Sequence, residues 1–121
     1  MPRPERIFPL VLVLVIGLIG ALPATASLAN PDSGNGSQIF STNCAACHMG
    51  GGNVIRASRT LSQQDLQAHL ESYLQDPIEA IENQIENGRN AMPAFEGKLS
   101  SSDIDDVAAF VERQAEKGWS R

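Results

Sequence analysis

The stretch Cys44-Ala45-Ala46-Cys47-His48 decides the fold, because two thiols one helical turn apart, followed directly by an imidazole, are the attachment signature of a c-type haem. Each thiol adds to one of two vinyl groups on the same porphyrin edge, and the histidine after them turns a ring nitrogen onto the iron. The chain has no other cysteine, so no other thiol competes for this role. The sequence therefore predicts one covalently attached haem c, with Cys44 and Cys47 as its anchors and His48 as an iron ligand.

Two other kinds of site use the same residue types. A disulfide between Cys44 and Cys47 would suit an oxidising compartment, but the thioredoxin-like motif expects a βαβ pattern, which this sequence lacks. A zinc site would draw on both cysteines, His48 and His69, but the paired-histidine spacing of zinc fingers is missing. Both stay open as weaker alternatives.

The candidates for the second axial ligand are Met49, Met92 and His69. Met49 directly follows the proximal histidine and cannot reach the opposite face of the haem. Met92 precedes Pro93, which blocks helix continuation and favours an extended residue before it, so a stiff loop would present the sulfur. His69 would give a bis-histidine haem of lower potential, although its polar-faced segment indicates a surface histidine. We expect Met92, with ligation by His69 and a core-filling role for Met92 as the alternatives.

The first 29 residues have the features of a secretory signal peptide. Two arginines provide a positive start, an apolar run covers residues 10–22, and small residues follow. As a helix this run would span roughly 20 Å, short of the ~30 Å hydrocarbon core of a bilayer. We expect cleavage after Ala26 or Ala29, which leaves one domain at 30–121; a retained anchor is the alternative.

The domain after the signal peptide is small and acidic. From residue 30 onward the sequence has seven basic and thirteen acidic side chains, a net charge of −6, which argues against nucleic acid and anionic membranes as partners. An acidic surface would speed the encounter with a partner that has basic docking patches. A requirement for solubility would explain the negative charge equally well. A chain of 92 to 95 residues is too small for a generous core, so we expect the porphyrin to complete the interior and the apoprotein to be largely unfolded.

Four helical stretches separated by loops predict an all-α domain. They cover residues 33–42, 62–73, 76–87 and 100–117. The three glycines at 50–52 permit the backbone turns that let a loop pass close to a flat cofactor, although a flexible linker would look the same.

The last two helices have the clearest signals. Asp76 and Ser100 are candidate N-caps, and Gly88 closes the third helix. The predicted core face of the third helix consists of Ile78, Ile81 and Ile85, with Gln84 at its edge. The predicted core stripe of the fourth consists of Ile104, Val107, Ala108, Val111 and Ala115, with Phe110 beside it.

Several segments, in this order, resemble the cytochrome c6 family. They are NCAACHMGGGNVI at 43–55, NGRNAMPAF at 87–95, and DVAAFV at 106–111 with KGW at 117–119. The likeness covers nearly all of the chain after the signal peptide. The pentapeptide alone fits any c-type cytochrome, whereas these segments together are much more specific.

This resemblance implies a class I cytochrome c fold, in which about four helices surround one haem attached at Cys44 and Cys47 and ligated by His48 and Met92. Gln84 matches a glutamine that lies near the haem in high-potential members and helps to set the potential. The resemblance further implies a soluble one-electron carrier, not an enzyme, in the thylakoid lumen or the periplasm. Such a carrier passes electrons from cytochrome f of the cytochrome b6f complex to photosystem I, and in some members to cytochrome oxidase.

Two departures from the family bear on the partner. Lys98 stands where the family usually has an arginine linked to docking on photosystem I; lysine keeps the charge but loses the planar fork. Residues 56–75 match least well. A divergent paralogue that donates to a respiratory oxidase or another acceptor is therefore an alternative. A haem peroxidase or gas sensor with a labile methionine is a further one, for which His69 is the only histidine left as a distal acid or base.

Overall fold

The computed structural model describes residues 17, 20–21 and 30–119, so both predicted cleavage points and nearly all of the predicted signal peptide lie outside the described residues. The helices are α1 (Ser33–Asn43), α2 (Ala45–His48), α3 (Gln63–His69), α4 (Pro77–Asn87) and α5 (Ser101–Glu116), with a 3-10 turn at Met49–Gly51. The described part contains no strand, which confirms the all-α prediction. None of its helices is long and apolar enough to cross a bilayer.

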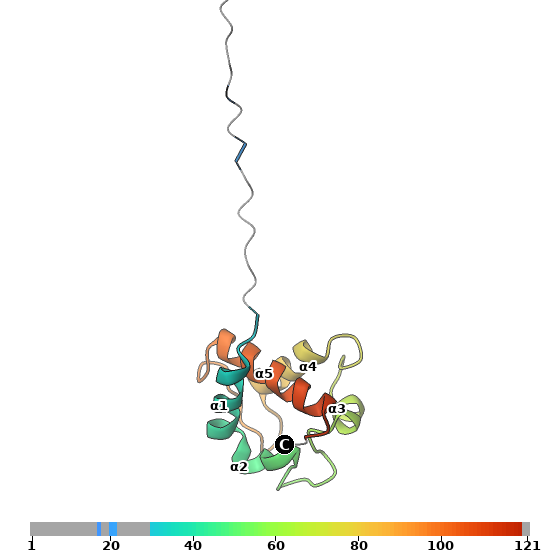
Figure 1. Ribbon diagram of the computed structural model, residues 1–121. Helices are drawn as coiled ribbons and strands as arrows, with labels where there is room; N and C mark the ends of the chain where they lie inside the picture. Colours follow the sequence, from blue (N-terminus) through green and yellow to red (C-terminus); the bar gives the residue numbers. More distant parts are fainter. Residues whose placement is uncertain (1–16, 18–19, 22–29, 120–121) are drawn as a thin grey trace, which may run out of the picture.

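Helix α5 is the element against which α1, α3 and α4 pack, and Figure 1 shows it crossing the middle of the body. The whole predicted stripe of α5 is buried, and Val107 and Ala108 have no exposed surface. At the contact with α1, Gly36 allows close approach of the two backbones. A Cβ at this position would lie 2.9 Å from Cβ of Phe110 and still closer to the carbonyl oxygen of Asp106.

Side-chain caps fix where the helices begin. Asp32, Ser62, Asp76 and Ser100 each accept a hydrogen bond from a backbone N–H group in the first turn of α1, α3, α4 and α5, respectively. The proline after Asp76 occupies the first helical position, where its missing N–H costs nothing. The predicted starts of α4 and α5 are confirmed.

The structure differs from the sequence prediction in three details. The attachment motif forms a short helix of its own, α2, which was not predicted. The helix expected at 62–73 ends at His69, and the chain turns at Ser72, whose φ is 64°. Ile78 is 37% exposed because it lies in the first turn of α4, outside the buried face. That face consists of Ala80, Ile81 and Ile85.

A polar network ties the start of α1 to α5. The backbone N–H of Asp32 donates to Oδ1 of Asp106 at 2.7 Å. The side-chain amide of Asn35 donates to Oδ2 of Asp106 at 2.7 Å and to Oδ1 of Asp103 at 3.0 Å. The amide of Asn35, together with Ser100, lowers the pKa of Asp103. These bonds fix the register of the two helices.

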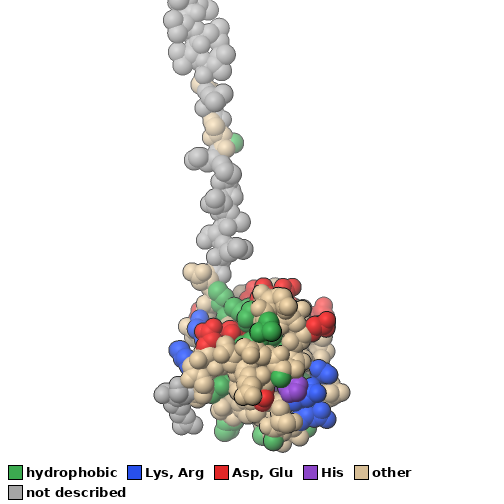
Figure 2. All heavy atoms as spheres, turned by 90° about the vertical axis from the view of Figure 1, so that its right-hand side faces the viewer, with side chains coloured by type: hydrophobic (Ala, Val, Ile, Leu, Met, Phe, Trp, Pro, Cys, Tyr) green, Lys and Arg blue, Asp and Glu red, His purple; other side chains and the backbone are tan. Residues whose placement is uncertain are grey.

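Charged side chains are unevenly distributed over the surface. On the face shown in Figure 2, acidic side chains gather along the top, whereas Lys and Arg side chains gather beside a histidine at the lower right. On this face the basic group beside the histidine is therefore separate from the acidic side chains at the top.

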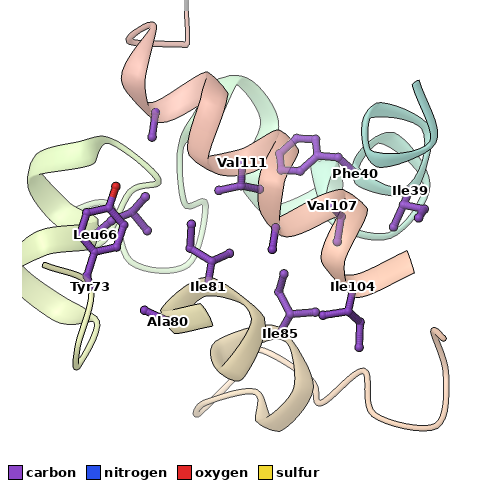
Figure 3. Packing of buried hydrophobic residues seen from close by; sticks show 12 residues of the cluster. Ile39, Phe40, Leu66, Tyr73, Ala80, Ile81, Ile85, Ile104, Val107 and Val111 are labelled. Atoms are coloured by element: carbon purple, nitrogen blue, oxygen red, sulfur yellow. The ribbon is translucent and has the colours of Figure 1, made fainter. Parts of the chain in front are cut away.

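The core is one cluster of apolar side chains from α1, α3, α4 and α5, shown in Figure 3. Tyr73, which follows α3, is only 2% exposed. Its hydroxyl donates to Oε2 of buried Glu112 on α5 at 2.6 Å. Burial and this carboxylate raise the pKa of Tyr73. The hydrogen bond satisfies both polar groups and links the α3 region to α5.

Two carboxyl groups meet where α4 packs against α5. Glu82 on α4 is half-buried, and its side chain hydrogen-bonds to that of Asp105 on α5. Two carboxyl groups share a hydrogen bond only when one of them is protonated. Burial first, and then the charges of Asp105, Asp76 and Glu86, raise the pKa of Glu82 to about 7.

We predict that Glu82→Gln removes a pH dependence of stability. Because the pKa of Glu82 is raised in the folded state, its contribution to the free energy of unfolding is fully present below the unfolded value of about 4.3 and is lost as the pH rises through about 7. Glutamine keeps a hydrogen bond without the charge. Urea unfolding of the holoprotein at pH 5 and pH 8 should show a smaller loss of stability in the variant than in the wild type. Glu79→Gln, an exposed charge removal on the same helix, is the control; equal slopes in both variants would contradict the prediction.

Candidate cofactor site

A cavity of about 420 Å³ brings the predicted site residues together. Both cysteines, His48, Gln84 and Met92 line it, so residues separated by up to 48 positions in the chain face one space. Core side chains complete the wall, among them Phe40, Leu66, Ile81, Ile85, Val107 and Val111. A mainly apolar wall with a few convergent polar groups, and a volume within about 300–1,000 Å³, are typical of cofactor sites.

Helix α2 presents the attachment motif to the cavity. The backbone N–H groups of Cys47 and His48 donate to the carbonyl of Cys44 at 3.2 and 2.9 Å, which closes the turn. Positions three and four apart on a helix lie on one face, so the two thiols and the imidazole share one side. Both thiols are free and half-buried, and burial raises the pKa of Cys44 to about 11.

The imidazole of His48 is held by the backbone. Its Nδ1 lies 2.8 Å from the carbonyl oxygen of Gly52. Because a carbonyl only accepts, Nδ1 carries the proton, and Nε2 keeps its lone pair for a metal. Gly50 and Gly51 make the turn that returns the chain to His48, with φ values of 64° and 80°. The glycine run therefore makes a backbone turn, as predicted, whereas its close approach to a cofactor stays a prediction.

Met92 lies in a tight turn after α4. Its backbone N–H donates to the carbonyl of Arg89 at 2.9 Å, and its own carbonyl accepts from the N–H of Arg89 at 3.0 Å. The side-chain amide of Gln84 donates to Sδ of Met92 over 3.9 Å, a weak bond of the kind that thioethers accept. Phe95 N–H donates to the carbonyl of Ile85 at 2.9 Å, which ties the segment back to α4.

The other candidate ligands are placed differently. Met49 is 74% exposed and is not among the residues that line the cavity. His69 is exposed at the end of α3 but also lines the cavity. No group of three or more His, Cys, Asp or Glu side chains within the described residues is arranged to hold a metal ion, so the zinc alternative gains no support.

Three arginines that the sequence analysis did not single out also line the cavity. They are Arg56, Arg59 and Arg89. Three of the seven basic side chains from residue 30 onward thus line this cavity, together with one carboxylate, that of Asp65. Their clustering in space was not visible in the sequence, because 30 residues separate Arg59 from Arg89.

Apolar side chains lie exposed beside the cavity. Val54 and Ile55 are 71% and 65% exposed, and Ile55 also lines the cavity. Exposed apolar residues that cluster at the mouth of a site are typical of an interaction surface.

The chain is similar to known cytochromes along most of its length. Residues 31–111 match the family model described as cytochrome C oxidase, cbb3-type, subunit III. The cytochrome c6 of Limnospira maxima is 54% identical over 88 residues, which are 73% of this chain and 99% of that protein. The crystal structure of cytochrome c6 from the diatom Phaeodactylum tricornutum matches with a TM-score of 0.67 and 47% identity, over 73% of this chain and 99% of that one. Cytochrome c6C from Synechococcus sp. PCC 7002 matches with a TM-score of 0.60 and 33% identity, over 69% and 96% of the two chains.

An all-α fold with a Cys-x-x-Cys-His turn facing an apolar cavity, together with these matches, defines a c-type cytochrome. The chain belongs to the cytochrome c6 family. It carries one covalently attached haem c and is an electron carrier rather than an enzyme.

Gly88→Ala should displace the turn that contains Met92. A Cβ at Gly88 would lie 2.5 Å from the carbonyl oxygen of Met92 and 2.6 Å from the carbonyl carbon of Pro93, and the φ of 64° disfavours any side chain. We expect a loss of about 2–4 kcal/mol in the free energy of unfolding, from backbone strain and overpacking together. Urea unfolding of the holoprotein measures it.

Gly97→Ala is the matched control, because Gly97 has a φ of 77° but nothing within 4 Å of an added Cβ. It should cost only the strain of the left-handed backbone, about 1–2 kcal/mol. Equal losses in the two variants would show that the contact with the Met92 turn contributes nothing.

Proposed function

We propose that this chain is a one-electron carrier whose haem is held by thioethers to Cys44 and Cys47, with His48 and Met92 as the iron ligands, and that it donates to photosystem I. One observation carries the proposal: two thiols, an imidazole with a free Nε2 and a methionine sulfur all line the same apolar cavity. A haem needs these four groups and no others from the protein for attachment and axial ligation.

Met92 is favoured over His69 as the second axial ligand by what surrounds it. Met92 is half-buried and packs against the core, and the amide of Gln84 orients its sulfur. His69 is exposed, so using it would bring a solvated side chain into an apolar space. A thioether donates less charge to ferric iron than an imidazole does, and it therefore raises the potential.

Gln84 would tune the potential through Met92. A hydrogen bond to the sulfur withdraws part of its lone-pair density, which weakens donation to ferric iron. The side chain thus acts in the same direction as the choice of methionine. The weak geometry, 3.9 Å between Nε2 and Sδ, makes this a modest adjustment.

The protein's remaining task is to fix the site and exclude other chemistry. When bound, the haem supplies an iron that alternates between the ferrous and ferric states. His48 and Met92 would hold the iron, and with both side chains in place substrates would not reach the metal. The carbonyl of Gly52 and the amide of Gln84 would keep these two side chains in place, which favours a low barrier for electron transfer.

The three arginines would bind the haem's two carboxylates. Arg56, Arg59 and Arg89 line the cavity, and guanidinium groups form paired hydrogen bonds with carboxylates. They would hold the porphyrin by these carboxylates, and the exposed apolar residues Val54 and Ile55 beside the cavity would offer a docking surface to a partner.

The family supports a proposal for the partner and the location. The identity to cytochrome c6 sequences is 54% and 47% in the matches above, against 33% for the c6C paralogue, which favours the photosynthetic carrier over a divergent paralogue. We therefore propose the thylakoid lumen or the periplasm as the location, after cleavage behind Ala26 or Ala29. There it would accept electrons from cytochrome f and donate to photosystem I, with cytochrome oxidase as a second acceptor.

Met92→Leu should lower the reduction potential and open the iron to small ligands. Leucine keeps the apolar volume but has no lone pair, so it leaves one axial position free. A redox titration and addition of carbon monoxide to the reduced protein measure the two effects. Met49→Leu, at an exposed methionine outside the cavity, is the control. An unchanged potential and spectrum in Met92→Leu would refute the ligand assignment.

Donor competence is tested with the holoprotein and flash-oxidised photosystem I. We expect reduction whose rate rises with the concentration of the protein and depends on ionic strength. A folded holoprotein with the expected potential that fails to reduce photosystem I, but reduces an isolated cytochrome oxidase, would assign the chain to the respiratory alternative.

A further inference from the structure

The last described residue of the chain, Trp119, closes the segment 51–61 against the body. Its indole N–H donates to the carbonyl of Leu61 at 2.7 Å, across 58 positions of sequence. Leu61 N–H in turn donates to the carbonyl of Gly51 at 2.7 Å. The indole also packs directly on Gly51, where an added Cβ would lie 2.6 Å from Cδ1 of the ring. The ring thus holds both ends of the segment.

This segment begins at the backbone that orients the proximal histidine. Gly51 directly precedes Gly52, whose carbonyl accepts the hydrogen bond from Nδ1 of His48. The segment then forms one wall of the cavity with Asn53, Ile55, Arg56, Arg59, Thr60 and Leu61. A side chain that fixes Gly51 and Leu61 therefore also fixes the Gly52 carbonyl, which accepts the ring proton of His48.

The indole itself is immobilised by an aromatic cluster. Its ring centre lies 5.3 Å from that of Phe40 on α1 and 6.3 Å from that of Phe110 on α5. These distances and the tilted or edge-on geometry are those of favourable aromatic pairs. The C-terminal ring is therefore fixed to the two helices that form the centre of the fold.

We propose that Trp119 is a positioning residue for the axial histidine: by holding Gly51 and Leu61 it keeps the Gly52 carbonyl on Nδ1 of His48 and thereby sets the reduction potential. This inference rests on the proposed ligation of the iron by His48. A strong hydrogen bond at Nδ1 makes the imidazole a better donor and stabilises ferric iron. Loss of the contacts made by Trp119 weakens the hydrogen bond from His48 to Gly52, so the reduction potential rises.

The test uses the holoprotein with Trp119→Phe and Trp119→Leu. Phenylalanine keeps an aromatic ring over Gly51 but loses the donor to Leu61, and leucine loses both. We expect exchange of the His48 Nδ1 proton, followed by NMR, to be about tenfold faster in Trp119→Leu and accelerated to a smaller degree in Trp119→Phe, because loss of the hydrogen bond to Leu61 lets the segment open more often. The potential should rise in the same order.

Tyr73→Phe is the matched control. It also removes a hydrogen bond made by an aromatic side chain, here the one to Glu112, but Tyr73 neither lines the cavity nor contacts the segment 51–61 through any such bond. It should lower the stability and leave both the proton exchange and the potential at their wild-type values.

Wild-type exchange and potential in a folded Trp119→Phe and Trp119→Leu would overturn the proposal and leave Trp119 with a stabilising role only. If Trp119→Leu does not fold, Trp119→Phe decides alone. A wild-type holoprotein without an iron-shifted ring resonance from His48 would instead refute the ligation by His48, which separates failure of the proposed function from failure of this inference.

Discussion

Val107 and Val111 on α5 belong both to the protein core and to the wall of the cavity. The rest of the structure depends on this sharing of side chains between core and site. A domain of this size has too few apolar side chains for a separate core and a separate site. The same helix therefore packs against α1, α3 and α4 and offers its remaining apolar surface to the haem. Stability and cofactor binding are coupled because they share these atoms, as in other small metal-binding domains.

Local signals in the sequence predicted the parts of the fold that local forces decide. The N-caps Asp76 and Ser100 and the apolar stripe of α5 were readable because capping and helical periodicity act within a few residues. The end of α3 was not, since Leu70 leaves the helical conformation, with φ −95° and ψ 123°, and no glycine or proline marks this point. Ile78 was assigned to the core by its spacing alone, and spacing does not show where a neighbouring helix stops covering a face.

The part of the candidate site that consists of neighbouring residues in the sequence was predictable. Cys44, Cys47 and His48 follow one another, and their attachment role is a property of that spacing. Two features of the site were not predictable: the grouping of the arginines at the cavity and the hydrogen bond from Trp119 to Leu61. Both join positions that are distant in the sequence, and no local pattern encodes such contacts. The choice between electron acceptors depends on surfaces of other proteins.

The half-buried state of Cys44 has a consequence for maturation. Its thiol, with a pKa of about 11, stays protonated in the closed protein, and a protonated, shielded thiol is a poor nucleophile. Helix α5, which forms part of the cavity wall, follows the attachment motif in the chain and is therefore synthesised after it. Covalent loading of the porphyrin is therefore favoured on an open polypeptide, so that biogenesis runs from attachment to folding rather than the reverse.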